Sequence, residues 1–409
     1  MNKSHSCRSC GSSHLRRFLD LGNQPLANNL PRPDDALDRE PRFPLRVAVC
    51  ESCRLVQIED TVPPVTLFGE YLYFSSFSDA MVRHAAEAVV VHTGSCNLGV
   101  DSFVVEIASN DGYLLKNFVS AGIPCLGVEP AANIAEVAVA SGVPTLCEFF
   151  GVATSAKVVA EYGQADLILG NNVFAHAPDI NDFIGGMAGL LKSGGRIVLE
   201  FPYLGNFIDN IEFDTVYHEH VFYFSVLALA PAFARHGLEI FDVTLLDIHG
   251  GSLRLSVGHA GVHEKTVALQ ELVGQEKAAG MDADYYYDSF SKQVEHLRTQ
   301  LVELVGELKE AGHSLAAYGA SAKGSTLLNF FGIGQGTLDF VADRSTYKQG
   351  RLTPGTHLPI VPPEALLERM PDYTLLLTWN FAKEILLQQD AYRKAGGKFI
   401  IPLPEPTIV

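Results

Sequence analysis

The sequence lacks long hydrophobic runs, and this absence excludes one class of protein. No stretch of about 18 or more apolar residues occurs in the 409-residue chain, so no membrane-spanning helix is predicted. The N-terminal segment carries Lys3, Arg8, Arg16 and Arg17 but no apolar stretch like that of a secretory signal. We therefore expect a cytoplasmic protein with no membrane partner.

Basic residues are also in short supply. The 30 Lys and Arg residues are outnumbered by 47 Asp and Glu residues, which gives a formal net charge of −17. A protein that wraps a nucleic-acid backbone needs clustered basic side chains, so no nucleic-acid partner is expected. A locally positive site for an anionic substrate is still compatible with this balance. The length predicts two or three domains, and joining them in one chain is compatible with a monomer.

Seven cysteines are present, and four of them form two Cys-x-x-Cys pairs. Cys7 pairs with Cys10, and Cys50 pairs with Cys53, with 39 residues between the pairs. Two such pairs can supply the four thiolates of one tetrahedral zinc site, and four thiolates leave no open position for a catalytic water. We therefore expect a structural Zn²⁺ on these four cysteines. Two disulfides or a redox pair are the alternatives.

Three regions of the chain differ in composition and in their predicted secondary structure. Residues 1–75 are Pro-rich and turn-rich, and we expect a small β module that zinc binding helps to fold. Residues 76–265 open with a helix over 78–93 and then alternate strands with helices, which predicts a parallel, doubly wound sheet. Residues 266–409 contain a connecting helix over 284–311 and a second Rossmann-like α/β unit. The predicted fold class is α/β with an N-terminal zinc-binding β module.

The turn after the first strand of the central unit points to a cofactor. It reads Glu106-Ile107-Ala108-Ser109-Asn110-Asp111-Gly112, with one glycine where a dinucleotide fingerprint has three. Asp111 would repel a pyrophosphate but not a cationic or aminoacyl group, so we favour S-adenosylmethionine over NAD. A strand end with solvated acids is the non-functional alternative.

The next strand ends in Glu129, where a carboxylate accepts hydrogen bonds from ribose hydroxyls. Together, the cofactor-binding residues that we expect near these strand ends are Glu106, Ala108, Asn110, Asp111, Gly112, Glu129, Pro130, Glu148, Phe149, Asn171 and Asn172.

Two further groups of residues suit acid–base chemistry. His176 follows a later strand, on the edge where open α/β sheets bind ligands. Tyr217-His218-Glu219-His220 lies beside an aromatic run, and apolar surroundings shift the pKa values of such groups toward those useful in catalysis. A structural histidine and a simple loop cap are the respective alternatives. The cluster has no His-Glu-x-x-His spacing, which disfavours a metal site there.

Several segments are candidates for substrate contacts. Tyr71-Leu72-Tyr73 could close over the site, although aromatic residues in such places more often only pack. His249-Gly250-Gly251-Ser252-Leu253-Arg254 puts a histidine and an arginine in one turn, which a plain β-turn explains almost as well. Gly319 to Gly324 resembles an anion-binding turn at a helix N-terminus. The side chains expected to bind substrate are His249, Arg254, Ser321, Lys323, Lys348 and Arg351.

In order and span, these motifs resemble those of the sugar C-methyltransferases of deoxysugar biosynthesis. The resemblance covers nearly the whole chain: the paired Cys-x-x-Cys, Glu-Ile-x-x-Asn-Asp-Gly, Gly-Val-Glu-Pro, Tyr-x-Glu-His, His-Gly-Gly-x-x-Arg and Tyr-Gly-Ala-x-Ala-Lys. It implies an N-terminal zinc domain, a central S-adenosylmethionine domain and a C-terminal Rossmann-like domain that helps to hold a nucleotide sugar.

The resemblance also implies roles for individual residues. By position, His220 matches the family's base, Glu219 its acidic neighbour and Tyr217 an active-site tyrosine. His176 matches an active-site histidine, and either Tyr71 or Tyr73 matches a lid tyrosine. Two departures stand out. Glu-Ile-Ala-Ser occupies a place where a Gly-Cys or Gly-Ser pair is usual, and His218 replaces an Asp.

The implied substrate is a nucleotide-linked 4-keto-deoxysugar, with dTDP as the expected nucleotide. A ketone acidifies the neighbouring C–H, so a base can form an enolate whose carbon accepts a methyl group. We expect His220 to be that base, oriented by Glu219, with Tyr217 and His176 donating to the enolate oxygen. The alternatives are O- or N-methylation of a small metabolite, and a zinc-ribbon interaction protein with inert Rossmann units.

Overall fold

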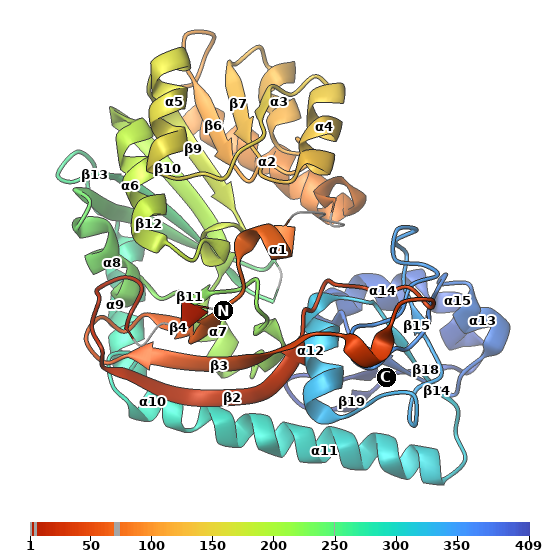
Figure 1. Cartoon of the computed structure of the whole chain (residues 1–409). Helices are drawn as coiled ribbons and strands as arrows, with labels where there is room; N and C mark the ends of the chain where they lie inside the picture. Colours follow the sequence, from red (N-terminus) through yellow and green to blue (C-terminus); the bar gives the residue numbers. More distant parts are fainter. Residues whose placement is uncertain (1, 4–5, 69–73, 249) are drawn as a thin grey trace.

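The computed structural model describes residues 2–3, 6–68, 74–248 and 250–409. Within them, Figure 1 shows a central α/β domain, an N-terminal β module against its lower side, and a C-terminal α/β domain beside that module. The expected α/β fold class is confirmed. In this part of the chain, no helix is both long enough and apolar enough to cross a membrane.

The N-terminal module is a small antiparallel sheet, and one of its strands comes from the central part of the chain. Its own strands β2 (Leu15–Pro25), β3 (Arg42–Cys50) and β4 (Val56–Ile58) pair in sequence. The fourth strand, β11 (Phe222–Tyr223), belongs to the central part of the chain and pairs with β4. The remaining elements are β1 (Asn2–Lys3), η1 (Leu37–Arg39), β5 (Asp60–Thr61) and α1 (Pro64–Phe68).

The central domain has a seven-stranded sheet in the order β12-β13-β10-β9-β6-β7-β8. Five strands are parallel, as the alternation of strands and helices predicted. A hairpin of β12 and β13 adds the antiparallel edge. The strands are β6 (Val104–Ile107), β7 (Cys125–Val128), β8 (Thr145–Leu146), β9 (Ala165–Asn171), β10 (Leu191–Pro202), β12 (Leu238–Leu246) and β13 (Ser252–His259).

Helices cover both faces of this sheet, because successive side chains of a strand point to opposite sides. Val104 packs with α2 and α3 on one face, and Val105 packs with α5 and α6 on the other. Ser78 caps α2 by accepting the Met81 N–H at 3.3 Å. The helices are η2 (Ser75–Phe77), α2 (Asp79–Ser95), α3 (Leu115–Ser120), α4 (Ala132–Ala140), α5 (Val152–Tyr162), η3 (Phe174–His176), α6 (Ile180–Leu190), α7 (Leu204–Asp209), η4 (Phe213–Thr215) and α8 (Val226–Ala234).

A helical connector leads to the C-terminal domain, and its last helix runs beneath the module in Figure 1. It consists of α9 (Val267–Ala279), α10 (Tyr285–Asp288) and α11 (Phe290–Glu310). The single helix expected over 284–311 is thus interrupted at Ser289. At this point Tyr287 and Phe290 are fully buried against the Phe18 ring of β2.

The C-terminal domain repeats the α/β principle with a sheet in the order β16-β15-β14-β17-β18-β19, parallel except for β19. Its elements are β14 (Leu315–Tyr318), α12 (Ala322–Phe331), β15 (Val341–Ala342), β16 (Ile360–Val361), α13 (Ala365–Arg369), β17 (Tyr373–Leu376), η5 (Trp379–Phe381), α14 (Ala382–Gln388), α15 (Asp390–Lys394), β18 (Lys398–Ile401) and β19 (Thr407–Ile408). The N-terminus of α12 faces the central domain.

Candidate active site

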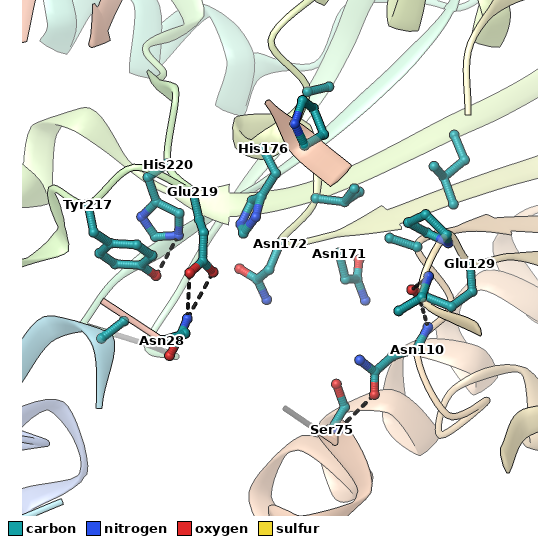
Figure 2. Close-up of a pocket in the computed structure, with 18 of the residues that line it drawn as sticks. Asn28, Ser75, Asn110, Glu129, Asn171, Asn172, His176, Tyr217, Glu219 and His220 are labelled. Carbon is teal, nitrogen blue, oxygen red and sulfur yellow. Dashed lines mark hydrogen bonds between the residues drawn. The ribbon is translucent and has the colours of Figure 1, made fainter. Parts of the chain in front are cut away.

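A cavity of about 650 Å³ lies where the three parts of the chain meet. Figure 2 shows polar side chains gathered at two ends of it. We call one the strand-edge end, formed by Ala108, Asn110, Glu129, Asn171 and Asn172. We call the other the histidine end, formed by His176, Tyr217, Glu219 and His220. The module adds Asn28, and the C-terminal domain adds Ser321, Lys323 and Lys348.

The turn after β6 shapes the strand-edge end. Ala108, Asn110 and Gly112 have left-handed φ angles of 53°, 51° and 77°, which fold the turn back on itself. The Asn110 N–H thereby donates to Glu129 Oε2 at 3.0 Å, and the Ala131 N–H donates to Oε1 at 2.9 Å. At Gly112 there is no room for a larger residue, since a Cβ would lie 2.8 Å from Val143 Cγ2.

Three carboxylates are buried around this turn. Glu106, Asp111 and Glu129 are 1%, 6% and 4% exposed. Burial, and then the charges of Glu129 and Asp111, raise the pKa of Glu106 well above its usual range. Burial also raises the pKa of Glu129, and the two backbone N–H donors oppose this shift.

These carboxylates fit a cationic ligand. Among the described residues, Glu106 Oε2 and Asp111 Oδ1 have no hydrogen-bond partner. A buried carboxylate oxygen without a donor is costly, and a nearby positive charge reduces that cost. Glu129 also has lone pairs left for ribose hydroxyls. These carboxylates therefore suit S-adenosylmethionine, whose sulfonium and ammonium groups are positive.

Not every predicted cofactor residue reaches the cavity. Of the described residues, Ala108, Asn110, Glu129, Pro130, Phe149, Asn171 and Asn172 line it, whereas Glu106, Asp111, Gly112 and Glu148 do not. Glu148 is held by Lys157 at 2.7 Å and by the Thr154 hydroxyl at 3.1 Å, because the first turns of α5 point these donors at it. Cofactor contact by these four residues stays a prediction.

The segment before α2 is hydrogen-bonded to the same turn. The Ser75 N–H donates to Asn110 Oδ1 at 2.9 Å, and the Ser76 N–H donates to Asp111 Oδ2 at 3.1 Å. Ser75 lines the cavity and was not predicted. Backbone donors leave no residue-type signal, so no sequence pattern could have found them.

His176 lies in η3, directly after β9. Burial lowers its pKa to about 4, so its imidazole is neutral at pH 7 and can donate one N–H. Its ring lies edge-on to that of His220, with centroids 4.9 Å apart. The sheet edge therefore brings His176 to the 217–220 cluster, as Figure 2 shows.

The hydrogen bonds of His220 fix its tautomer. Nδ1 lies 2.8 Å from the Thr215 carbonyl oxygen, which only accepts, so Nδ1 carries the proton. In the neutral ring Nε2 is then the basic nitrogen, and the Tyr217 hydroxyl donates to it at 2.7 Å. We expected Glu219 to orient this imidazole. Instead the backbone carbonyl of Thr215 does so, because the tight 215–220 turn brings it within reach.

Glu219 pairs with a different part of the chain. Its two carboxylate oxygens accept the Asn28 amide Nδ2 at 2.7 and 2.9 Å. Burial raises the pKa of Glu219 to about 7, and the Asn28 hydrogen bond opposes this rise. Asn28 is 191 residues away in sequence, and nothing in the sequence marked it as part of the site.

His218 points out of the site. It is 2% exposed and packs edge-on to the Phe43 ring of β3 with centroids 5.8 Å apart. Burial lowers its pKa. Among the described residues, His218 does not line the cavity.

The N-terminus of α12 supplies part of the substrate side. Ser321 caps the helix, its Oγ accepting the Gly324 N–H at 3.0 Å. Lys323 Nζ lies 4.7 Å above the Trp379 ring and 3.9 Å from Glu212. Lys348 Nζ donates to the Ala320 carbonyl at 2.7 Å. All three predicted side chains, Ser321, Lys323 and Lys348, line the cavity.

Two other predicted substrate residues are engaged elsewhere. Arg254 on β13 pairs with the buried Glu200 at 2.7 Å, and Glu200 also bonds His84 at 2.7 Å. Arg351 donates to the Leu30 carbonyl at 3.2 Å. Neither arginine is among the described residues that line the cavity, so substrate binding by the two stays a prediction. Tyr71, Tyr73 and His249 lie outside the described residues.

The four paired cysteines form one cluster. Their Sγ atoms all lie within 4.8 Å of one another, with Cys7–Cys53 at 3.5 Å and Cys10–Cys50 at 3.6 Å. A tetrahedral Zn²⁺ with Zn–S bonds of about 2.3 Å separates its sulfurs by roughly 3.8 Å. All four thiols are free of disulfides. The cluster therefore fits the predicted zinc.

Known families match the chain in three consecutive pieces. Residues 7–68 match a zinc binding domain, residues 94–243 a methyltransferase domain, and residues 247–404 a C-methyltransferase C-terminal domain. The C-methyltransferase NovU of Streptomyces niveus is 37% identical over 98% of this chain and 96% of its own length.

The likeness to solved structures is weak. Magnesium protoporphyrin IX methyltransferase from Synechocystis PCC 6803 with bound SAH is 14% identical, with a TM-score of 0.36, over 47% of this chain and 91% of that one. The complex of the Haloferax volcanii Trm112 activator with a methyltransferase is 18% identical, with a TM-score of 0.34, over 44% of this chain and 94% of that one. These likenesses are too distant to bear on the chemistry.

Proposed function

Because the chain belongs to the sugar C-methyltransferase family and depends on S-adenosylmethionine and zinc, we propose a specific reaction for it. It transfers a methyl group to a ring carbon beside the ketone of a dTDP-linked 4-keto-deoxysugar. The observation that carries the proposal is one cavity shared by the strand-edge end, the histidine end and a helix N-terminus with two lysines. These three parts support separate binding regions for a cofactor, a carbon acid and a diphosphate.

We assign the three regions corresponding roles. Residues 1–75 form the zinc module, and residues 76–265 bind S-adenosylmethionine. Residues 266–409 comprise the helical connector and the C-terminal domain that holds the nucleotide. When bound, S-adenosylmethionine supplies an electrophilic methyl group for the substrate carbanion. At the strand-edge end, Glu129 would hold its ribose, while Asp111 would favour its cationic groups, and their positive charge would in turn favour the ionised form of the buried Glu106.

His220 is the proposed base. The Thr215 carbonyl keeps the proton on Nδ1, which leaves Nε2 to take the proton from the carbon beside the ketone. Tyr217 now donates to that nitrogen, so the substrate must displace this hydrogen bond. The freed phenol would then donate to the enolate oxygen. Correctly placed general bases contribute about 10²- to 10⁴-fold to rate.

His176 is the second proposed donor to the enolate oxygen. Its lowered pKa supports a neutral N–H donor, which binds the enolate without protonating it fully. One such donor contributes about 2.7–4 kcal/mol to a transition state that develops negative charge on oxygen. Glu219, whose carboxylate lies between these groups and the module, would bind a substrate hydroxyl or organise the site.

The C-terminal side chains support binding of a diphosphate. Ser321, Lys323 and the N-terminus of the ten-residue α12 face the cavity, and Lys348 adds a second cation. Both lysines already lie near carboxylates, Glu212 and Asp343, each at 3.9 Å. A diphosphate has to compete with those pairs, which favours a doubly charged ligand over a neutral metabolite.

The deciding experiment incubates the protein with S-adenosylmethionine and a panel of nucleotide 4-keto-sugars, and locates any added methyl group by NMR. We expect a new C–CH₃ bond beside the ketone. In D₂O with S-adenosylhomocysteine, the same carbon should exchange its proton, and His220→Asn should abolish the exchange. A methyl group on oxygen or nitrogen, with no exchange, would overturn the proposal in favour of a small-metabolite methyltransferase.

A further inference from the structure

The zinc module reaches into the cavity through one polar side chain. Asn28 follows β2, with Leu26, Ala27 and Leu30 buried on either side of it. This anchoring leaves the half-buried Asn28 amide facing Glu219. From this geometry we propose that Asn28 is a positioning residue of the active site, which holds Glu219 ionised and in place for the reaction.

The hydrogen-bond pattern indicates which form of Glu219 the module selects. One Asn28 nitrogen approaches both carboxylate oxygens, at 2.7 and 2.9 Å. An ionised carboxylate only accepts, so both of its oxygens can accept from the Asn28 nitrogen. A protonated carboxyl group carries an O–H on one oxygen, and this O–H has to donate to another acceptor. The 4% exposure of Glu219 raises its pKa to about 7, and Asn28 opposes that rise. Near neutral pH, the Asn28 hydrogen bond therefore favours the charged form of Glu219 against the larger effect of burial.

The module also holds the chain segment that carries Glu219. Val221 donates its N–H to the Ala175 carbonyl at 2.8 Å and accepts the Ile58 N–H at 2.9 Å. Directly afterwards, β11 pairs with β4 of the module. The module, the His176 segment and the 217–220 cluster are thus joined at one residue, which fixes Asn28 and Glu219 relative to each other.

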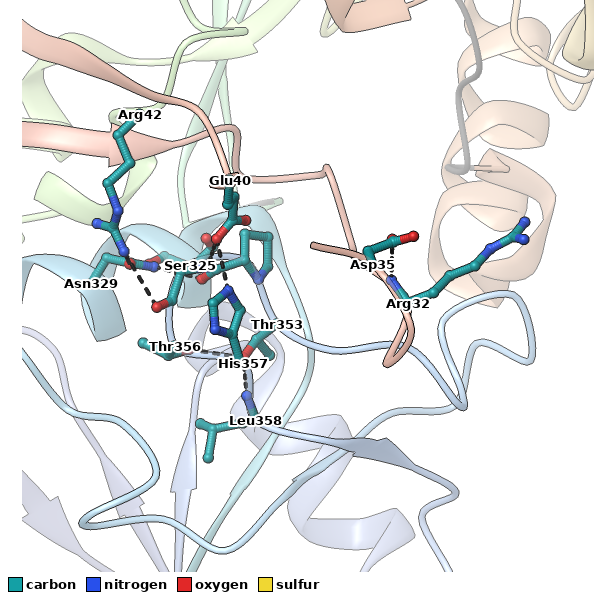
Figure 3. Close-up of polar contacts among 12 residues, drawn as sticks. Arg32, Asp35, Glu40, Arg42, Ser325, Asn329, Thr353, Thr356, His357 and Leu358 are labelled. Atoms are coloured by element: carbon teal, nitrogen blue, oxygen red, sulfur yellow. Dashed lines mark hydrogen bonds and ion pairs between the residues drawn. The ribbon is translucent and has the colours of Figure 1, made fainter. Parts of the chain in front are cut away.

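A second set of contacts holds the far end of the Asn28 segment, as Figure 3 shows. Glu40 accepts the Gly355 N–H at 2.7 Å and pairs with His357 at 2.9 Å. Arg42 donates to the Gly355 carbonyl at 3.3 Å. Nearer Asn28, the Leu352 N–H donates to the Pro31 carbonyl at 2.8 Å. The segment is therefore held by the same domain that supplies Lys323 and Lys348.

The other charged and titratable groups that line the cavity with Glu219 come from four segments of the chain. Tyr217 and His220 lie on its own turn, and His176 lies on η3. Lys323 on α12 and Lys348 on the loop after β15 line the same cavity. All of these are present in any Asn28 variant, so a change in the Glu219 titration on substitution isolates the amide.

The first test needs no substrate. The full-length zinc protein, labelled with ¹³C at glutamate side chains, is titrated by NMR, and Glu219→Gln identifies the signal of Glu219. In Asn28→Ala we expect the pKa of Glu219 to rise by about one unit, as for loss of a hydrogen bond to a charged group. The neighbouring, exposed Asn29→Ala should leave it unchanged. An unchanged pKa in Asn28→Ala would overturn the proposal.

A second variant guards against misfolding. Asn28→Asp keeps the shape of the side chain but replaces the donor by a like charge, so the pKa of Glu219 should rise at least as far as in the alanine variant. Asn29→Asp is its charge-matched control. Bound zinc and the circular dichroism spectrum report on folding. Equal shifts in the Asn28 and Asn29 variants would mean a general field effect and would also overturn the proposal.

The catalytic part of the inference rests on the proposed function. With an accepted substrate, kcat/KM of Asn28→Ala should fall about fivefold at pH 7 and recover toward the wild-type value above pH ~9, because the acid limb moves up by about one unit. A loss that is equal at every pH would indicate a merely structural role. If the wild-type protein methylates none of the sugars, the proposed function fails, but the titration still decides the role of Asn28.

Discussion

The two ends of the cavity are built in opposite ways. The strand-edge end comes from one sheet, where a single turn and the next strand bond each other through backbone N–H groups. The histidine end combines η3 and the 217–220 turn, and it shares the cavity with Asn28 of the module and the lysines of the C-terminal domain. The first end is local, and the second requires three domains to be docked.

This difference separates cofactor binding from chemistry. A turn held by its own backbone should keep its shape when a neighbouring domain is disturbed. An end assembled across domains loses its geometry as soon as one of them moves, and small misplacements of reacting groups cost large factors in rate. We therefore expect perturbations of the module to affect turnover far more than S-adenosylmethionine affinity.

The largest effect should follow loss of zinc. In small zinc domains the metal contributes about 10–16 kcal/mol toward folding, so Cys50→Ser or chelation should unfold the module. We expect turnover to fall at least about 100-fold, since Asn28 and the β4–β11 pairing are lost. S-adenosylmethionine affinity, measured by calorimetry, should change only a few-fold.

The control for this experiment is Cys147→Ser, which removes an exposed cysteine from outside the cluster. It should leave turnover and affinity at wild-type values. An equal loss of affinity and turnover on zinc removal would break the distinction between the two ends.

The next largest effect should come from His220→Asn. Removing the base should lower kcat by about 10²- to 10⁴-fold. Because His220 lies at the histidine end, the Kd for S-adenosylmethionine should stay the same. Near-normal turnover in a variant that still binds the cofactor would remove His220 from the role of base.

A stability difference should accompany the burial of Glu219. Its pKa is raised in the folded state from the usual 4.5 to about 7, so its contribution to stability is fully present below about pH 4.5 and is lost as pH rises through 7. Relative to Glu219→Gln, the wild-type protein should lose at most about 3 kcal/mol over this window. Thermal unfolding of both proteins between these pH values measures it, and parallel curves would contradict it.

The smallest effect should come from the strand-edge end. Glu129→Gln weakens hydrogen bonds to a charged acceptor, so the Kd for S-adenosylmethionine should rise about tenfold while kcat at saturating cofactor stays within about threefold. Glu148→Gln is the matched control, because Glu148 already bonds Lys157 and is not among the described residues that line the cavity. An equal rise in Kd for both variants would contradict the placement of Glu148.

Local patterns explain which parts of the site were predictable. The cysteine pairs needed only their own spacing, and Glu129 needed only its place at a strand end. Arg254 and Arg351 matched substrate-binding patterns equally well, yet Glu200 and the Leu30 carbonyl bind them. A sequence pattern gives the chemistry of a side chain, but it does not show which competing partner lies nearer in the folded chain.

By itself, the sequence determined the zinc ligands, the alternating strands and the carboxylate at the end of β7, because each depends on residues close together in the chain or on ligand chemistry alone. Only the tertiary structure decided that Asn28 meets Glu219, that Thr215 orients His220, and that β11 completes the sheet of the module. These contacts depend on how domains dock or how one turn closes, and docking is set by the whole buried surface rather than by any motif.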